Sequence, residues 1–110
     1  MHLAVEAGKS AVVETLLGNG AQVHIKGGKV GETPLHIAAR IEETRGEKCT
    51  KMLLKSGADT NLAMQDGRTP LHIAGESGNI AVLKLLLANG ADALMVDKVR
   101  FLKYFAYQNI

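Results

Sequence analysis

The feature that most constrains this chain is an eight-residue segment, Gly-x-Thr-Pro-Leu-His-Ile-Ala, which occurs at 31–38 and again at 67–74. Thr is a favoured N-cap residue because its side-chain oxygen accepts a hydrogen bond from a free N–H of the first turn. Pro suits the first helical position, where its missing N–H would be unpaired anyway. Glycine two residues earlier permits a turn with positive φ. The segment therefore predicts the same short helix twice, begun by Thr33-Pro34 and by Thr69-Pro70.

A Gly-Ala pair recurs with the same spacing and divides the chain into three units. The pairs begin at Gly20, Gly57 and Gly90, which lie 37 and 33 positions apart. Histidines occupy matching places in the three units, at His2, His36 and His72. The middle unit is four residues longer than the third, and three of these extra residues follow its histidine.

A period of 33 residues with Thr-Pro-Leu-His-x-Ala resembles the ankyrin-repeat family over residues 1 to about 95. The resemblance implies an all-α solenoid of about three repeats, in which helix-turn-helix units carry β-hairpin fingers. We divide the chain into a truncated first repeat (1–28), a second repeat (29–61), a third repeat (62–95) and a tail (96–110). Each helix pair is too small to bury its own apolar face, so stacking must supply the stability. The first unit should expose the face that a preceding repeat would cover, so we expect an isolated chain to be marginally stable or to self-associate.

The helices of the third unit are predicted at about 70–76 and 80–88, and Gly90 ends the second of them. The second helix of the first unit is predicted at about 10–17. In the middle unit, the charged residues 42–48 are predicted to form a solvated loop between the helices, because loops tolerate insertions.

The tail departs from the repeat pattern and holds all four aromatic residues between Phe101 and Tyr107. A terminal helix that caps the last repeat is one interpretation, because repeat arrays need caps. Non-repeat sequence from a truncated or differently spliced product is a second interpretation. A docking segment for a partner is the third.

Composition excludes several classes of function. A net charge of +2 without a basic face gives no reason to expect nucleic acid as a partner. The longest apolar stretch, 80–88, contains Lys84 and is half a membrane span at best, so no direct membrane insertion is expected. One cysteine excludes an internal disulfide and fits a reducing compartment, and no signal peptide is evident. We expect a cytoplasmic module.

No catalytic, metal or cofactor site is predicted. Histidines on adjacent repeats should lie about 8–10 Å apart, too far for shared zinc ligation, where nitrogens lie about 2 Å from the metal. Gly8-Lys9-Ser10 lacks the first glycine of a phosphate-binding loop. Cys49 falls in register with Val12 and Val82 and is therefore predicted to be a small core residue rather than a nucleophile.

The family resemblance assigns structural and binding roles to individual residues. It implies that His36 and His72 hydrogen-bond locally and tie one repeat to the next, a role that we expect His2 to have lost with its threonine. It also implies protein binding through hairpin fingers and a concave helix face, with no partner identified by the mixed charges. The expected surface comprises His24, Lys26, Lys29, Glu32, Arg40, Ile41, Met64, Gln65, Asp66, Arg68, Glu76 and Ser77.

A narrower resemblance covers 26–40, the charged insertion and 51–58. These stretches look like the ankyrin array of NompC-type mechanosensory TRP channels. The resemblance implies an alternative function as a spring or tether in a longer array, at the cytosolic face of a membrane and without the pore. Its partners would be neighbouring ankyrin repeats and the cytoskeleton.

Overall fold

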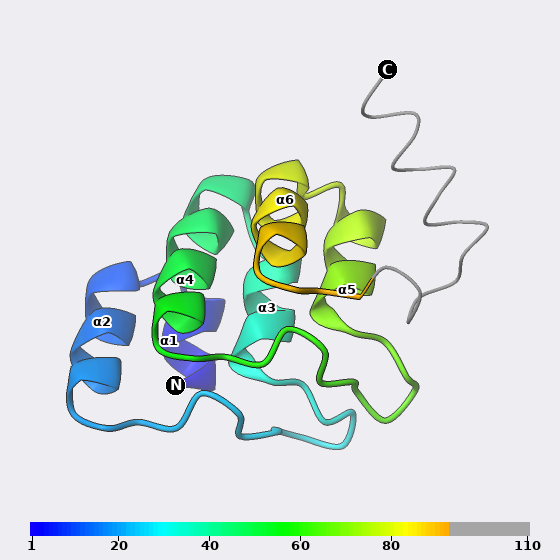
Figure 1. Cartoon of the computed structure of the whole chain (residues 1–110). Helices are drawn as coiled ribbons and strands as arrows, with labels where there is room; N and C mark the ends of the chain where they lie inside the picture. Colours follow the sequence, from blue (N-terminus) through cyan, green and yellow to red (C-terminus); the bar gives the residue numbers. More distant parts are fainter. Residues whose placement is uncertain (93–110) are drawn as a thin grey trace.

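The computed structural model describes residues 1–92, which form six helices in two layers (Figure 1). The first helix of each repeat packs against its counterpart in the next, and the second helices do the same. We call the layer of first helices the inner layer and the layer of second helices the outer layer. The helices are α1 (His2–Glu6), α2 (Ser10–Gly18), α3 (Pro34–Arg40), α4 (Glu43–Lys55), α5 (Pro70–Ser77) and α6 (Ile80–Ala88). This arrangement confirms the predicted solenoid. The aromatic tail, with the last residues of the third repeat, lies outside the described residues.

Both predicted helix starts are present with the expected capping. The Thr33 hydroxyl accepts a hydrogen bond from the His36 N–H at 3.4 Å, and Thr69 does the same for the His72 N–H at 3.4 Å. The proline that follows each threonine is the first helical residue. The turn before each cap contains a glycine with positive φ, 73° in the second repeat and 88° in the third.

The second helix of each repeat ends in the same way. The alanine of the Gly-Ala pair donates its N–H to the carbonyl oxygen five residues earlier, which is the Schellman arrangement. These bonds join Ala21 to Leu16, Ala58 to Leu53 and Ala91 to Leu86, at 3.0, 3.0 and 2.9 Å. Gly90 therefore ends α6 as predicted, and the other two Gly-Ala pairs end α2 and α4 in the same way.

The charged insertion is helical, and the prediction of a loop at 42–48 is wrong. Helix α4 begins at Glu43 and has 13 residues, against nine in α6. The Glu42 carboxylate caps it by accepting the N–H groups of Thr44 and Arg45 at 3.0 and 3.2 Å. These bonds lower the pKa of Glu42. The insertion thus adds about one turn to the outer helix.

The fingers that precede α3 and α5 extend from the same end of the helices (Figure 1). Within residues 1–92 they contain no strand, but Gly27 and Glu32 form an antiparallel bridge with bonds of 2.8 and 3.2 Å. The fingers contact each other, because the Gln65 N–H donates to the Val30 carbonyl at 2.9 Å. The predicted hairpins are present as tight turns, and within residues 1–92 only the first finger has a bridge.

The core follows the register of the repeats. Leu35 and Leu71 are buried at matching positions in the inner helices, and Leu53 and Leu86 are buried in the outer helices. Cys49 is fully buried among apolar side chains, as its register predicted. The first repeat differs, because Leu3 is 85% exposed where its counterparts Ile37 and Ile73 are 3% and 6% exposed. The face that a preceding repeat would cover is therefore open, as expected.

Candidate protein-interaction surface

His36 joins the second repeat to the third through a fully buried ring. Its Nδ1 lies 3.1 Å from the Thr33 N–H nitrogen and 2.7 Å from the Thr33 hydroxyl, and its Nε2 lies 2.9 Å from the Arg68 carbonyl oxygen. Because an N–H can only donate and a carbonyl can only accept, Nδ1 is unprotonated and Nε2 carries the proton. Burial lowers the pKa of His36 and favours this neutral form.

His2 keeps the connection between repeats that we expected it to have lost. Its Nε2 lies 2.8 Å from the Glu32 carbonyl oxygen, the counterpart in the second repeat of the Arg68 carbonyl. The bond needs only the ring and the next repeat, so the missing threonine does not prevent it. His72 differs, because its Nε2 lies 3.5 Å from the Glu76 carboxylate on the same helix. Two of the three periodic histidines therefore tie adjacent repeats together within residues 1–92.

Charged side chains of the first and second repeats meet on the inner side of the stack, beside α1 and α3. Arg40, in the last turn of α3, donates to Glu32 with its Nε at 2.8 Å and reaches Glu6 of the first repeat with its Nη2 at 2.9 Å. The hydrogen bond from Arg40 lowers the pKa of Glu32, and the two carboxylates raise the pKa of Arg40. Arg40 therefore bridges two repeats.

The third repeat has the same pair with the charges exchanged. Arg68 stands where Glu32 stands and Glu76 where Arg40 stands, and their side chains meet at 2.7 Å. Arg68 also contacts Asp66 at the turn of its own finger, at 2.9 Å. We call the six charged residues of these two clusters the inner ion-pair surface: Glu6, Glu32, Arg40, Asp66, Arg68 and Glu76.

Most of the predicted surface residues are accessible, but three have structural roles. Met64 is only 6% exposed and belongs to the core, and Ile41 is partly buried because it packs against the core. His24 is exposed, but its Nε2 accepts the Asp59 N–H at 2.8 Å and links two repeats. The exposed members are Lys26, Lys29, Arg40, Gln65, Asp66, Glu76 and Ser77, and Glu32 and Arg68 are partly exposed.

Sequence reasoning missed two apolar residues of the first finger. Ile25 and Val30 are 49% and 50% exposed and flank the lysines of the finger tip. A signal was available in the register, because Val30 immediately precedes the turn glycine where the next finger has Asp66. Because the next finger has aspartate at this position, the position faces solvent rather than the core. An apolar residue there is a candidate for contact with a partner.

Neither a metal-binding cluster nor a thiol with a lowered pKa is present within residues 1–92. Within residues 1–92 no group of three or more His, Cys, Asp or Glu side chains could hold a metal ion. Burial raises the pKa of the Cys49 thiol, which disfavours the reactive thiolate. No helix in the described part of the chain is long and apolar enough to cross a membrane.

Comparison with known proteins agrees with this architecture. The family model described as ankyrin repeats in three copies matches residues 1–97. The chain is 38% identical over 95 residues to the Neurogenic locus notch homolog protein 1 of Xenopus tropicalis, 39% over 89 residues to the Neurogenic locus Notch protein of Drosophila melanogaster and 36% over 97 residues to Inversin of Gallus gallus. These alignments cover 84%, 81% and 86% of the chain but 4%, 3% and 8% of the relatives. The chain belongs to the ankyrin-repeat family.

Proposed function

We propose that this chain is a non-catalytic protein-interaction module that meets its partner through the inner ion-pair surface and the adjacent finger tips. The observation that carries the proposal is the exchange of charges between repeats, Glu32–Arg40 in one and Arg68–Glu76 in the next. A partner whose charges complement one repeat would place like charges together if it were shifted by one repeat along the stack. Such a surface gives register-specific recognition, since like charges brought together are strongly unfavourable.

The small contribution of these ion pairs to stability supports a role in binding rather than in folding. Exposed ion pairs contribute only about 0–1 kcal/mol to stability. The side chains of this surface are between 21% and 53% exposed, so each pair belongs to that weak class. Long side chains held in place lose less freedom on association, which saves about 0.5–1.5 kcal/mol per side chain. The network therefore orders two arginines in advance of contact.

The first finger supplies an apolar component beside these charges. Ile25 and Val30 are each about half exposed, and Lys26 and Lys29 lie between them in the sequence. A partner segment that combines apolar side chains with carboxylates would match this finger.

Charge reversal tests the proposal. We expect Arg40→Glu/Arg68→Glu to reduce capture of a partner from a cell extract at least about tenfold, measured by quantitative mass spectrometry, because each change places carboxylates together. The double variant Lys48→Glu/Lys55→Glu, on exposed positions of α4, has the same change in net charge and serves as the control. Equal capture by wild type and both variants would exclude this surface.

Our alternative is a structural segment of a longer array, such as the tether of a TRP-type channel. The open face at Leu3, covered at the equivalent positions of later repeats, supports a neighbour on that side. The relatives compared above give no support to a channel, so that part rests on the sequence resemblance. Adding a consensus ankyrin repeat before Met1 should raise the unfolding midpoint, and an unchanged midpoint would contradict this alternative.

A further inference from the structure

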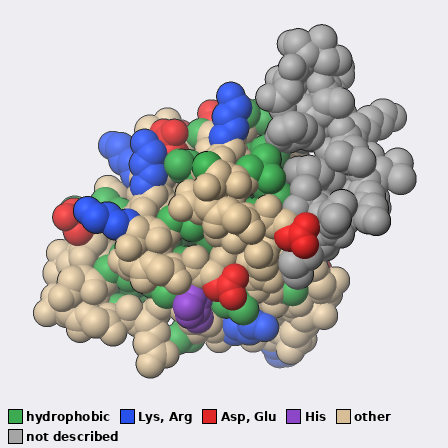
Figure 2. Space-filling view, viewed as in Figure 1, with side chains coloured by type: hydrophobic (Ala, Val, Ile, Leu, Met, Phe, Trp, Pro, Cys, Tyr) green, Lys and Arg blue, Asp and Glu red, His purple; other side chains and the backbone are tan. Residues whose placement is uncertain are grey.

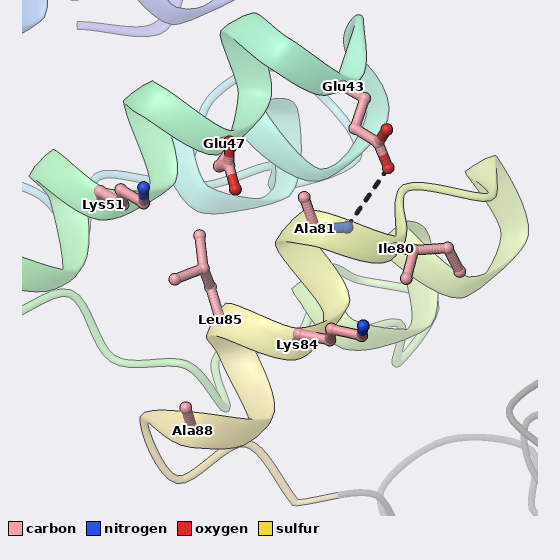
Figure 3. A pocket seen from close by; sticks show the side chains of 8 residues that line it. All are labelled: Glu43, Glu47, Lys51, Ile80, Ala81, Lys84, Leu85 and Ala88. Carbon is pink, nitrogen blue, oxygen red and sulfur yellow. Dashed lines mark hydrogen bonds between the residues drawn. The ribbon is translucent and has the colours of Figure 1, made fainter. Parts of the chain in front are cut away.

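A second surface lies on the opposite layer, in a groove of about 580 Å³ between the outer helices α4 and α6. Figure 3 shows Leu85 and Ala81 of α6 facing α4 across this groove, while Lys51 and Glu47 approach from α4. Figure 2 shows hydrophobic side chains reaching the surface beside Lys and Arg side chains over this part of the molecule. The groove is separate from the inner ion-pair surface.

The extra turn of α4 forms one end of the groove. Glu43, the first residue of α4, accepts the Ala81 N–H at 3.3 Å and so joins the start of α4 to the start of α6 (Figure 3). The insertion in the second repeat therefore has a structural consequence in the third. It extends the wall of the groove past the beginning of α6.

The side of α6 that faces the groove is unusually apolar for the outside of the stack. Its residues Ile80, Ala81, Leu85 and Ala88 line the groove. The register of the repeats places Glu47, Lys48, Met52 and Lys55 at the corresponding positions of α4. Three charges in one helix are thus replaced by apolar side chains in the other, and these side chains are only partly covered or exposed. Within residues 1–92, none of the four apolar side chains belongs to the buried core or to the partly buried side chains packed against it.

Charges are ordered along the groove. Glu43 and Glu47 lie at the end where α6 begins, and Lys51 and Lys84 lie about one turn further along their helices. Within residues 1–92 no ion pair engages Glu47, Lys51 or Lys84. The groove therefore presents an acidic end, an apolar floor and two unpaired ammonium groups.

We propose that this groove docks an amphipathic helix of a partner protein, with its N-terminus at Glu43 and Glu47 and its carboxylate side chains at Lys51 and Lys84. The positive end of the helix dipole then faces the carboxylates, and acidic side chains of the later turns face the lysines. Apolar residues at i, i+3, i+4 and i+7 pack on Leu85 and Ala81. The nine residues of α6 span about 13 Å, which sets the docked segment at roughly nine residues.

Charge favours a separate protein over the chain's own tail as the occupant. Residues 93–110 contain one acidic residue, Asp97, against the three basic residues Lys98, Arg100 and Lys103. A segment with that balance would place like charges near Lys51 and Lys84. An acidic helix matches them.

The test uses the full chain and two synthetic, lactam-bridged helical peptides as probes. Both carry the same leucine stripe, and they differ only in having Glu or Lys in the last two turns. We expect fluorescence anisotropy to show that the acidic peptide binds at least about tenfold more tightly than the basic one. Lys51→Glu/Lys84→Glu should reverse that preference. Lys48→Glu/Lys55→Glu carries the same change in net charge outside the groove and should preserve it.

Four results would overturn the proposal. The first is equal affinity of the wild-type chain for the two peptides, and the second is equal loss of the preference in the two lysine variants. The third is an intramolecular cross-link in the monomer from Lys84 to residues 93–110, which would assign the groove to the tail. Loss of peptide binding in Arg40→Glu/Arg68→Glu but not in Lys51→Glu/Lys84→Glu would likewise place the peptide on the inner surface. The test is independent of the proposed function, whose charge-reversal sites Arg40 and Arg68 lie on the inner side of the stack.

Discussion

His36 shows how a single side chain can decide the pH dependence of the stack. It is buried, its Nδ1 faces the Thr33 N–H, and its Nε2 donates to the Arg68 carbonyl across the repeat boundary. Protonation would place an N–H against an N–H, and burial already lowers the pKa of this histidine. The neutral ring is therefore part of the folded structure.

The free energy of unfolding should fall as the pH drops below about 6.5, the ordinary histidine pKa. In that range the unfolded chain binds a proton that the folded chain rejects, so stability is full above it and is lost as pH falls toward the lowered pKa. The slope contributed by His36 should approach about 1.4 kcal/mol per pH unit. Urea denaturation from pH 5 to 8 measures it, and His36→Gln should have a flatter profile. Parallel profiles would contradict this role.

At the scale of the element, Gly46 shows how closely α4 packs against α3. A Cβ at Gly46 would overlap the Ala38 carbonyl oxygen and lie 3.1 Å from the Asn79 side-chain nitrogen, so α4 can pass α3 only with glycine there. Gly46→Ala should therefore destabilise the fold by about 1–3 kcal/mol, although alanine is the better helix former.

Gly18 is the matched control for this prediction. It ends α2, and a Cβ there would meet no atom within 4 Å. Gly18→Ala should be neutral or stabilise by up to about 1 kcal/mol, by the helix preference alone. Thermal or urea unfolding of the two variants compares them directly. Similar effects of both substitutions would contradict the close approach at Gly46.

The same scale shows how far the sequence could predict this structure. Helix starts at Thr33 and Thr69 and stops at the Gly-Ala pairs were predictable because their capping chemistry is local. The start of α4 was missed because its cap is Glu42, outside the usual N-cap residues.

Side-chain roles were less predictable than helices. Met64 and Ile41 were expected on the surface, but tertiary packing buries Met64 and partly covers Ile41. The order of charges in Glu32–Arg40 and Arg68–Glu76 was visible in the sequence. That the partners meet, and that Arg40 also reaches Glu6, depends on stacking geometry.

At the scale of the whole molecule, stability should decline toward the open face of the first repeat. Leu3 and Ile37 are equivalent by register but are 85% and 3% exposed. Ile37→Ala should cost about 2–4 kcal/mol of unfolding free energy, whereas Leu3→Ala should cost less than about 0.5 kcal/mol. Urea denaturation of both variants measures the difference. Equal costs would mean that Leu3 is covered, for instance by self-association, which light scattering on a sizing column would detect.

The most direct test of the central claim, that a partner meets the inner side of the stack, is photocrosslinking from two positions. A photoreactive residue at Gln65, an exposed finger residue, should cross-link a partner, whereas one at Lys48, exposed on α4, should not. The same partner should be lost from the Gln65 position when Arg40→Glu/Arg68→Glu is added. Cross-links from both positions alike, or a Gln65 cross-link that survives the reversal of both arginines, would contradict the account.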